Sequence, residues 1–239
     1  MTIDFHAHIL PRCDHGCNNS AMSHDQLRLI QSCGTNAVVA TPHFYPNEDS
    51  IDSFLDGRDG AIDAMRRKLP LEELPTVYAG AEVLVCEGLH KMKGLERLAI
   101  EGTNVILLEM PIGRWSDLLM DTVLGVRDRG LTPVLAHIDR YDIHGVMELL
   151  NKGILAQVNA DAFGLFKNAK PYVELMREGK VVALGSDLHK VKRDRYRHFV
   201  RVKRKLGTLA DKVFARTAEL LKTATPIAAP NTAKKTQTV

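Results

Sequence analysis

The chain has 239 residues, of which 45% are hydrophobic and 26% charged, and its formal net charge is +3 at pH 7. This composition suits a globular protein with a sizeable core, and the small charge does not indicate a nucleic-acid or membrane partner. Its four cysteines do not make a disulfide scaffold at this length, so we expect reduced thiols in a cytoplasmic protein without signal peptide or membrane insertion.

The first predicted strand, TIDFHAH, carries His6 and His8. Residues two apart on a strand lie on the same face, so the two imidazoles can converge on one point. From this strand alone, two exposed polar residues on a half-buried strand explain the pattern equally well. The later motifs have to decide between these interpretations.

Five later segments share one plan, in which a helical end is followed by a glycine and a short aliphatic strand. Glycine just past the last helical turn is the expected helix stop, and aliphatic runs without alternation are typical of strands buried on both faces. The segments are SCGTNAVVATPH, IEGTNVILLEMP, DRGLTPVLAHID, NKGILAQVNAD and REGKVVALGSDLH. Together with TIDFHAH and TVYAGAEVL they predict seven strands.

Amphipathic stretches between these strands predict helices at residues 23–32, 51–69, 117–129, 143–151 and 169–177. Strands that alternate with helices indicate a parallel sheet with right-handed crossovers. Seven such units over about 220 residues favour a closed or nearly closed barrel. An open doubly wound sheet is the alternative fold, but no GxGxxG motif follows a strand to support it.

The C-terminal part differs in composition from the rest. We expect one folded domain over residues 1–222 and a disordered tail over residues 223–239, TATPIAAPNTAKKTQTV, which has no periodicity and is rich in Thr, Ala and Pro. Upstream of the tail, the stretch from Lys190 to Lys205 is strongly basic and helical in pattern. We expect a solvated helix face there, with a docking surface for an acidic or phosphorylated partner as the alternative.

Nine ionisable residues fall on the predicted strands near their carboxyl ends or in the loops that follow. They are His6, His8, His15, His43, Glu82, Glu109, His137, Asp187 and His189. In a parallel barrel all carboxyl ends open at the same rim, where active sites are built. One His or Glu at a strand end is usually a hydrogen-bonded polar group, but this many buried together need a compensating charge. We therefore predict a multinuclear metal site, for which imidazole and carboxylate without cysteine select Mn, Fe(II) or Zn.

Clustered metals suit the hydrolysis of phosphate esters, because they lower the pKa of bound water and clamp the attacking and leaving oxygens. Their charge exceeds that of three carboxylates, which favours an anionic substrate. Arg140, three residues after His137, can reach the same rim and hold phosphate oxygens. From spacing alone, an ion pair of Arg140 with Asp139 or Asp142 is an equally good interpretation. No Cys is followed six residues later by Arg, so thiolate-based phosphatase chemistry is disfavoured.

Six motifs occur together in the order and spacing of a known family: DFHAHILP, TPHFYP, GAEV, LLEMP, AHIDRY and GSDLH. Through them, residues 1–221 resemble the polymerase and histidinol phosphatase (PHP) superfamily. Within it the chain is most similar to the bacterial protein tyrosine phosphatases of capsule and exopolysaccharide operons, for which AHIDRY and Glu109 are the signatures. The resemblance implies an α/β fold of the distorted (β/α)₇ TIM-like barrel type.

The resemblance also implies a ligand set and a reaction. It suggests His6, His8, Glu82 and Asp187 around one metal ion, Glu82, Glu109 and His137 around a second, and His15, His43 and His189 around a third. We expect two or three divalent ions, manganese foremost, with iron or zinc suiting the same ligands. Arg140 matches the arginine that binds phosphate and acts in catalysis. The implied reaction is attack of a metal-activated hydroxide on phosphotyrosine, in the tail of a cognate autophosphorylating bacterial tyrosine kinase that controls polysaccharide export.

The chain departs from the family just after the first strand. The family usually reads DDG there, and this chain has Asp14, His15 and Gly16. The second Asp of the family is a metal ligand, and His at this place is common in the wider superfamily, so we expect metal binding to survive with one more positive charge. Asp14 then either orients a ligand histidine or gives a proton to the leaving phenolate, and we favour the first role.

Two other functions fit the same pattern. A small-molecule phosphatase of the histidinol-phosphatase type would use the same site, but Glu109 and the short loops favour a mouth open to peptides. A PHP domain kept as a non-enzymatic interaction module would be expected to have lost ligands, and this chain has the complete set. Trp115, the only tryptophan, is expected to pack at a helix start, with contact to a substrate ring as the alternative.

Overall fold

The computed structural model describes residues 1–164, 167–191 and 193–227. Within them, the strands form two sheets of order β10-β1-β2-β4 and β3-β5-β6-β7-β8-β9, and every ladder between these strands is parallel. The strands are β1 (Ile3–His8), β2 (Ala37–Ala40), β3 (His43–Phe44), β4 (Thr76–Ala79), β5 (Glu82–Leu84), β6 (Val105–Glu109), β7 (Thr132–Leu135), β8 (Leu155–Asn159), β9 (Val181–Gly185) and β10 (Leu188–His189). The predicted α/β class with a parallel arrangement is confirmed.

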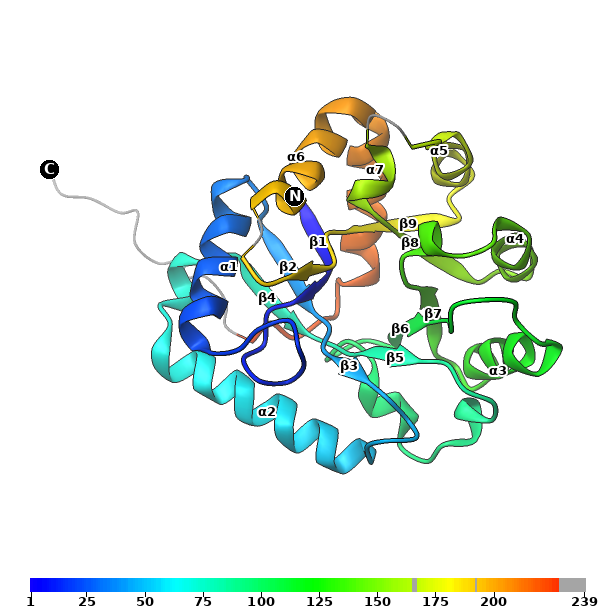
Figure 1. The fold of residues 1–239 in the computed structure, drawn as a ribbon, viewed down its shortest axis with the longest axis horizontal. Helices are drawn as coiled ribbons and strands as arrows, with labels where there is room; N and C mark the ends of the chain where they lie inside the picture. Colours follow the sequence, from blue (N-terminus) through cyan, green and yellow to red (C-terminus); the bar gives the residue numbers. More distant parts are fainter. Residues whose placement is uncertain (165–166, 192, 228–239) are drawn as a thin grey trace, which may run out of the picture.

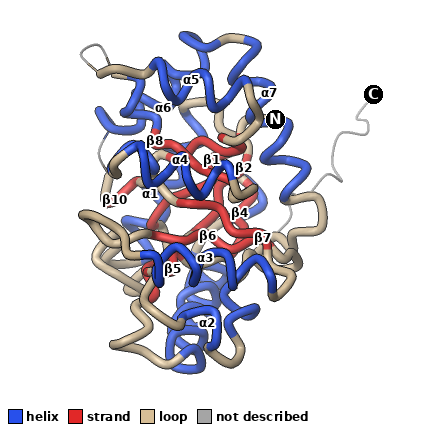
Figure 2. Tube along the Cα trace, turned by 90° about the vertical axis from the view of Figure 1, so that its right-hand side faces the viewer, coloured by secondary structure: helices blue, strands red, loops and turns tan. Residues whose placement is uncertain are grey.

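The α-helices are α1 (Ser20–Ser32), α2 (Ile51–Lys68), α3 (Asp117–Asp128), α4 (Ile143–Asn151), α5 (Lys170–Arg177), α6 (Arg193–Leu206) and α7 (Thr208–Leu220). In the view of Figure 1, helices lie around the central strands, with α1 and α2 on one side and α3, α4 and α5 on the other. Figure 2 shows the strands at the middle of the molecule with helices and loops outside them. The five predicted helices correspond to α1–α5 with small shifts at their ends. Between β5 and β6 the described chain forms two short 3₁₀ helices, Leu89–Lys91 and Leu95–Leu98, instead of an α-helix.

Helices α1, α2 and α3 begin at side-chain caps, and the predicted glycine stops are confirmed. Asn19 begins α1 by accepting a hydrogen bond from the backbone N–H of Met22, and Ser50 and Ser116 cap α2 and α3 in the same way. The glycines of the repeated plan, at positions 34, 102, 130, 153 and 179, have φ of 74°, 80°, 87°, 89° and 81°. These are left-handed conformations that favour glycine, so the repeated glycine marks the turn from helix or loop into each strand.

Each of the seven predicted strands is present, and three are interrupted into β2 and β3, β4 and β5, and β9 and β10. Pro42 lies in the first interruption and has no backbone N–H to give to a ladder. In all three pairs the two parts belong to different sheets. The interruptions therefore connect one sheet to the other.

A small core cluster also links the sheets. It contains Phe5 and Val39 from the first sheet and Leu107 and Val134 from the second, all fully buried. Leu107 lies in register with both Glu82 and Val134, so these three side chains point to the same side of the second sheet. Glu82 therefore points into the space between the two sheets. A larger cluster packs residues of helices α1–α7 around the outside of the strands.

The predicted disordered tail begins with five described residues that contact the sheet. The N–H of Ile227 donates to the carbonyl of Val77 at 2.7 Å, and Pro226 forms an antiparallel bridge with Tyr78. The N–H of Thr225 donates to the carbonyl of Glu101 at 2.9 Å, and the Ile227 side chain is buried. Residues 223–227 thus extend the folded body beyond the predicted boundary at 222, and residues 228–239 lie outside the described part.

The basic stretch Lys190–Lys205 contributes most of α6. Its apolar side is buried through Tyr196, Phe199 and Val202, while the side chains of Arg201 and Arg204 are exposed. The predicted solvated basic face is therefore confirmed for these two arginines, whereas Lys192 and the side chains of residues 193–195 lie outside what is described. None of the helices in the described residues combines the length and apolar character that a bilayer crossing requires.

We predict that Ile227→Ala lowers the free energy of unfolding by about 2 kcal/mol, because it removes a buried aliphatic side chain at the end of the fold. Val200→Ala is the matched control, since Val200 is 40% exposed and its truncation should change stability by less than about 0.5 kcal/mol. Urea denaturation followed by circular dichroism measures both. Equal effects of the two substitutions would show that residues 223–227 do not add to the stability of the domain.

Candidate metal centre

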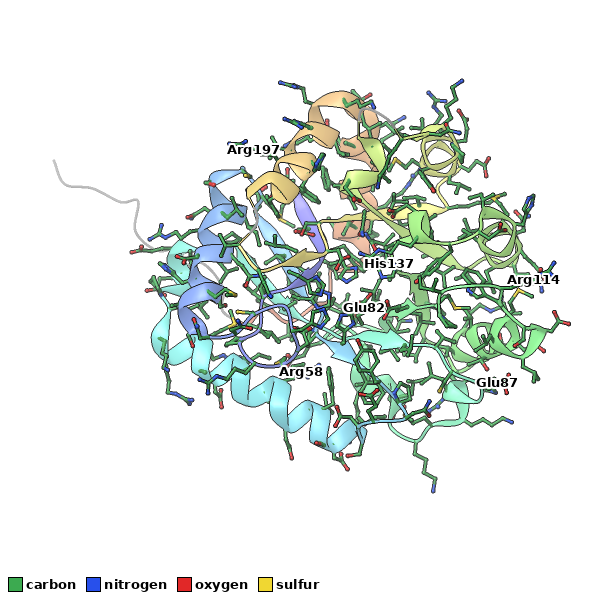
Figure 3. All side chains as sticks on the ribbon, in the orientation of Figure 1. Arg58, Glu82, Glu87, Arg114, His137 and Arg197 are labelled. Atoms are coloured by element: carbon green, nitrogen blue, oxygen red, sulfur yellow. The ribbon has the colours of Figure 1, made fainter. Side chains whose placement is uncertain are left out.

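The predicted ligands come together in the space between the sheets. Eight of them form four groups of three, within each of which one ligand atom per residue lies within 4.8 Å of the others. The groups are His8, His43 and His189; His6, His8 and Asp187; His6, Glu82 and His137; and His43, Glu82 and Glu109. Figure 3 shows Glu82 and His137 side by side at the centre of the molecule.

Glu82 lies at the middle of this cluster and its side chain has no exposure. Its Oε1 is 2.7 Å from Nε2 of His137. Its Oε2 is 3.1 Å from Nε2 of His6, 3.2 Å from Nε2 of His8 and 3.1 Å from Nδ1 of His43. Four imidazoles from β1, β3 and the segment just after β7 thus surround one carboxylate. They can do so because the ends of these strands open on the same space.

The electrostatics of Glu82 follow from these contacts. Burial by itself would raise the pKa of the Glu82 carboxyl, but the charge of His6 and the hydrogen bond with His137 outweigh it and hold the pKa well below its usual range. Glu109 behaves in the opposite way, because burial and the nearby negative charge of Glu82 both raise its pKa. The carboxylate of Glu82 is thus strongly held in its charged form, which attracts cations into a buried space.

Asp187 provides the second fixed negative charge. Its Oδ1 lies 3.2 Å from Nδ1 of His189 and 3.4 Å from Nε2 of His8. Burial would raise its pKa, but the hydrogen bonds with His189 and His8 and the charge of Arg140 lower it far below the ordinary value. Asp187 and His137 have φ of 50° and 29°, backbone conformations that are rare for residues other than glycine and that cluster at functional sites.

His15 is the ninth predicted ligand, and it lies at the outer edge of the cluster. Its ring centroid is 4.6 Å from that of His189 and 5.1 Å from that of His43. The residue is exposed, whereas His6, His8 and His137 are buried. Burial and the neighbouring His189 lower its pKa, which keeps a lone pair available on the imidazole. His15 is therefore positioned to complete a ligand group at the mouth.

Asp14 has the geometry of an orienting residue. Its Oδ2 lies 2.6 Å from Nδ1 of His8 and also accepts the backbone N–H of His43, while its Oδ1 accepts the N–H of Gly16. Burial would raise its pKa, but the hydrogen bond with His8 lowers it well below the ordinary value. A carboxylate held in the charged form is a poor proton donor. This contact turns Nε2 of His8 toward Glu82, so the geometry favours the orienting role over proton donation.

The donors fit bound divalent cations. Several buried polar atoms of the described residues that have no hydrogen-bond partner belong to this cluster, among them Oε2 of Glu82, Nδ1 of His43 and Nε2 of His189. In addition, Nε2 of His6 and Nε2 of His8 approach within 3.1 Å of each other. Buried lone pairs that converge in this way are costly without a positive charge between them. Imidazole and carboxylate donors without thiolate suit Mn, Fe(II) or Zn.

Arg140 reaches the ligand cluster, as the interpretation of this residue as a phosphate-binding group predicted. Its guanidinium contacts Oδ2 of Asp187, and its side chain remains 40% exposed. The neighbouring acids have other partners: Asp139 accepts the backbone N–H of Asn159, and Asp142 caps α4 by accepting the N–H of His144. The alternative of a local surface ion pair is therefore wrong for the described geometry.

Two site residues on β8 were missed by the analysis of the sequence. Oε1 of Gln157 accepts the backbone N–H of His137 at 2.6 Å and lies 3.4 Å from Nδ1 of His6. Nε2 of Gln157 donates to Asn159, whose Nδ2 donates to Asp187. The signal was present, because Gln and Asn two apart interrupt the aliphatic strand ILAQVNAD and face the same side.

Close packing supports this arrangement of β8. A Cβ atom on Gly185 would lie 2.5 Å from Nε2 of Gln157 and 2.7 Å from Cβ of His6, so a side chain there would displace both. Gln157 thus orients the buried ring of His6 and holds the backbone of His137. Residues that support metal ligands usually make contacts of this kind.

The sequence is similar to a known protein family over most of its length. Residues 2–221 match the family model described as capsular polysaccharide synthesis, CpsB/CapC. The chain belongs to this family. It is 28% identical over 204 residues to tyrosine-protein phosphatase YwqE of Bacillus subtilis (strain 168), covering 80% of this chain and 78% of that protein. It is 25% identical over 203 residues to tyrosine-protein phosphatase CpsB of Streptococcus agalactiae, covering 78% of this chain and 82% of the relative.

Solved structures share the fold of this family member. One of them belongs to the structures of YwqE from Bacillus subtilis and CpsB from Streptococcus pneumoniae, which are described as unique metal-dependent tyrosine phosphatases. It superposes on this chain with a TM-score of 0.76 at 23% identity, and the match covers 96% of this chain and 98% of that one. A histidinol phosphate phosphatase of Lactococcus lactis subsp. lactis, solved with zinc, L-histidinol and phosphate, gives a TM-score of 0.54 at 14% identity and covers 89% and 93% of the two chains.

We predict that the double substitution His6→Ala and His8→Ala lowers the amount of bound divalent metal by about tenfold or more, because it removes two converging donors. Elemental analysis of the dialysed protein after loading with Mn²⁺ measures this. His24→Ala is the matched control, since His24 lies in α1 outside every described ligand group. Full metal retention in the double variant, with an unchanged circular dichroism spectrum, would refute the ligand assignment.

We also predict that Gln157→Ala weakens metal affinity by about 10-fold, because the His6 ring and the His137 backbone lose their common partner. Competition with a chromophoric chelator gives the affinity directly and does not depend on activity. Gln31→Ala, on the exposed side of α1, should leave the affinity unchanged. An affinity equal to that of the wild type would mean that Gln157 only fills space.

Proposed function

We propose that this protein is a metal-dependent protein tyrosine phosphatase that dephosphorylates an autophosphorylating bacterial tyrosine kinase in capsule or exopolysaccharide synthesis. The observation that carries the proposal is the convergence of buried imidazoles and carboxylates on Glu82 in a member of the CpsB/CapC family. Relatives over four fifths of the chain are named tyrosine-protein phosphatases. A phosphotyrosine side chain in the C-terminal tail of the kinase is the substrate that fits this assignment.

The four ligand groups support two or three metal ions, and Glu82, which belongs to two of the groups, would help to hold them. His6, His8 and Asp187 would hold one ion, Glu109 and His137 a second, and His15, His43 and His189 a third. When bound, divalent ions there supply positive charge and lower the pKa of water to give a nucleophile near neutral pH. Manganese is our first choice, and iron or zinc suits the same donors.

Arg140 is proposed to bind the phosphate. A planar guanidinium can donate two parallel hydrogen bonds to the non-bridging oxygens and offset the charge that develops on them during transfer. The contact with Asp187 holds the side chain over the ligand cluster, and its partial exposure leaves N–H groups free for an incoming substrate. In the overall reaction the bond from phosphorus to the tyrosine oxygen breaks, water supplies the new oxygen, and tyrosine and inorganic phosphate are released.

We further infer that the two sheets form one distorted (β/α)₇ barrel. The support is that each interrupted strand contributes one part to each sheet: β2 and β3, β4 and β5, and β9 and β10. The ladder between β10 and β1 would then join the last strand to the first. In such a barrel the ligands lie at the carboxyl ends of the strands, where active sites of these folds are found.

Two substrate classes fit the same site. A small-molecule phosphatase of the histidinol-phosphatase type would have the same ligands and the same fold. Because an intracellular kinase domain would be the partner, we place the protein in the cytoplasm, without a nucleic-acid partner. An assay that offers both substrate types decides between the two functions.

We predict that the Mn²⁺-loaded protein hydrolyses a phosphotyrosine peptide with a higher kcat/KM than histidinol phosphate, and that EDTA abolishes both activities. Phosphate release with and without Mn²⁺ is the measurement. Faster hydrolysis of histidinol phosphate would replace the proposed function with the small-molecule alternative. Release of phosphate at the same rate in EDTA would contradict the metal-dependent mechanism.

In the same assay, Arg140→Ala should lower kcat by about 10²–10³-fold, because the transition state loses a charged hydrogen-bond donor. Arg28→Ala is the matched control, since Arg28 is 49% exposed and lies on α1. An Arg140→Ala variant with normal kcat but a raised KM would limit the role of Arg140 to binding in the ground state.

A further inference from the structure

A groove of about 870 Å³ opens beside the candidate metal centre, between the segment after β6 and the segment after β7. Arg140 lines it at one end, so the groove is continuous with the proposed phosphate site. Arg114, Trp115, Met120 and Tyr141 also line it. In Figure 3, Arg114 lies near the outer edge of the molecule beside α3 and α4, whereas His137 lies at its centre. The groove therefore leads from the centre toward the surface.

Two aromatic rings of the groove, Tyr141 and Trp115, continue from the buried ring of His137. The ring centroid of Tyr141 is 5.6 Å from that of His137, and the ring of Trp115 meets Tyr141 edge to face at 5.2 Å. Both outer rings are fixed by hydrogen bonds: Nε1 of Trp115 donates to the carbonyl of Pro111 at 3.0 Å, and the hydroxyl of Tyr141 accepts the N–H of Met110 at 3.0 Å. A surface already held in place costs little entropy when a ligand binds.

Two exposed apolar side chains lie next to groove residues in the sequence. Ile112 is 77% exposed and Leu118 is 61% exposed, and they flank the groove residues Arg114 and Trp115 in sequence. Among the large hydrophobic side chains of the described residues, only Met1, at 67%, is comparably exposed. Together with the apolar groove residues Trp115 and Met120, they offer contacts to an apolar side chain of a partner.

Of the described groove residues, Arg114 is the one group that offers an unpaired positive charge to an acidic partner residue. Among the described residues, Arg114 makes no ion pair, and its side chain is exposed. Of the three acids that line the groove, Glu148 pairs with Lys152 at 2.9 Å and Asp142 caps α4, while Asp117 lies in the first turn of α3. An incoming carboxylate would therefore find Arg114 available.

We propose that this groove binds the peptide chain on one side of the phosphotyrosine, with an apolar side chain against Trp115 and Ile112 and an acidic side chain at Arg114. The inference rests on the proposed phosphatase function and specifies its substrate class: a phosphotyrosine within an apolar and acidic peptide segment. A free phosphotyrosine or a small phosphate ester would occupy only the end of the groove at Arg140. The groove thus makes this enzyme selective for peptide sequence.

The experiment uses the metal-loaded full chain and three substrates. They are p-nitrophenyl phosphate, a peptide whose phosphotyrosine is flanked on both sides by Leu and Glu, and a peptide flanked by Gly and Ser. We expect kcat/KM for the first peptide to exceed that for the second by about tenfold, a difference typical of one apolar side chain or one ion pair. We expect Arg114→Ala and Ile112→Ser each to reduce this preference at least severalfold through KM, with p-nitrophenyl phosphate hydrolysed at the wild-type rate. Arg28→Ala and Val200→Ser are the matched surface controls.

The single tryptophan gives a second readout that is independent of turnover. Titration with a non-hydrolysable phosphonate analogue of the Leu and Glu peptide should change Trp115 fluorescence in a saturable way, and Arg114→Ala should weaken that binding severalfold. Trp115 itself is kept, because it packs against Gly145 and its removal risks the local fold.

The outcomes separate the two proposals. Equal kcat/KM for both peptides in the wild type, with p-nitrophenyl phosphate and both peptides hydrolysed, would overturn the groove and leave the phosphatase function standing. A preference that survives Arg114→Ala and Ile112→Ser would assign peptide selection to another surface and also overturn it. Hydrolysis of none of the three substrates would refute the proposed function, and the groove as a substrate site would fall with it.

Discussion

The buried carboxylate of Glu82 is the constraint on which this structure depends. It has no exposure and lies within 3.2 Å of nitrogens from four imidazoles. A charge in such a place is stable only if cations surround it, because the protein interior replaces the water that would otherwise solvate it. The fold therefore has to deliver histidines from distant parts of the chain to one point, and a bound divalent cation is the partner that this donor set suits.

The parallel strands bring these histidines together, and polar side chains around them fix their orientations. Asp14 turns His8, Gln157 holds the His6 ring and the His137 backbone, and Asn159 contacts Asp187. Each of these partners comes from a different segment than the ligand that it orients. The strained backbone at His137 and Asp187 is tolerated because hydrogen bonds and packing over-determine the positions of these residues.

Family membership and geometry lead to the same chemistry from different directions. The CpsB/CapC match concerns almost the whole described chain. Arg140 contacts Asp187 of the buried ligand cluster and also lines the adjoining groove. The aromatic rings of His137, Tyr141 and Trp115 connect the candidate metal ligands with the proposed peptide groove.

The sequence by itself determined the α/β class, the seven strands and the residues that meet at the site, since glycine stops, aliphatic runs and polar strand ends are local features. Only the tertiary structure decided what depends on neighbours distant in sequence. Asp187 rather than an adjacent acid pairs with Arg140, because the two strand ends meet in space. Strand order likewise decides that Gln157 contacts His6 and His137. Residues 223–227 have the composition of a disordered tail, but in the folded chain their backbone groups form hydrogen bonds with β4 and Glu101.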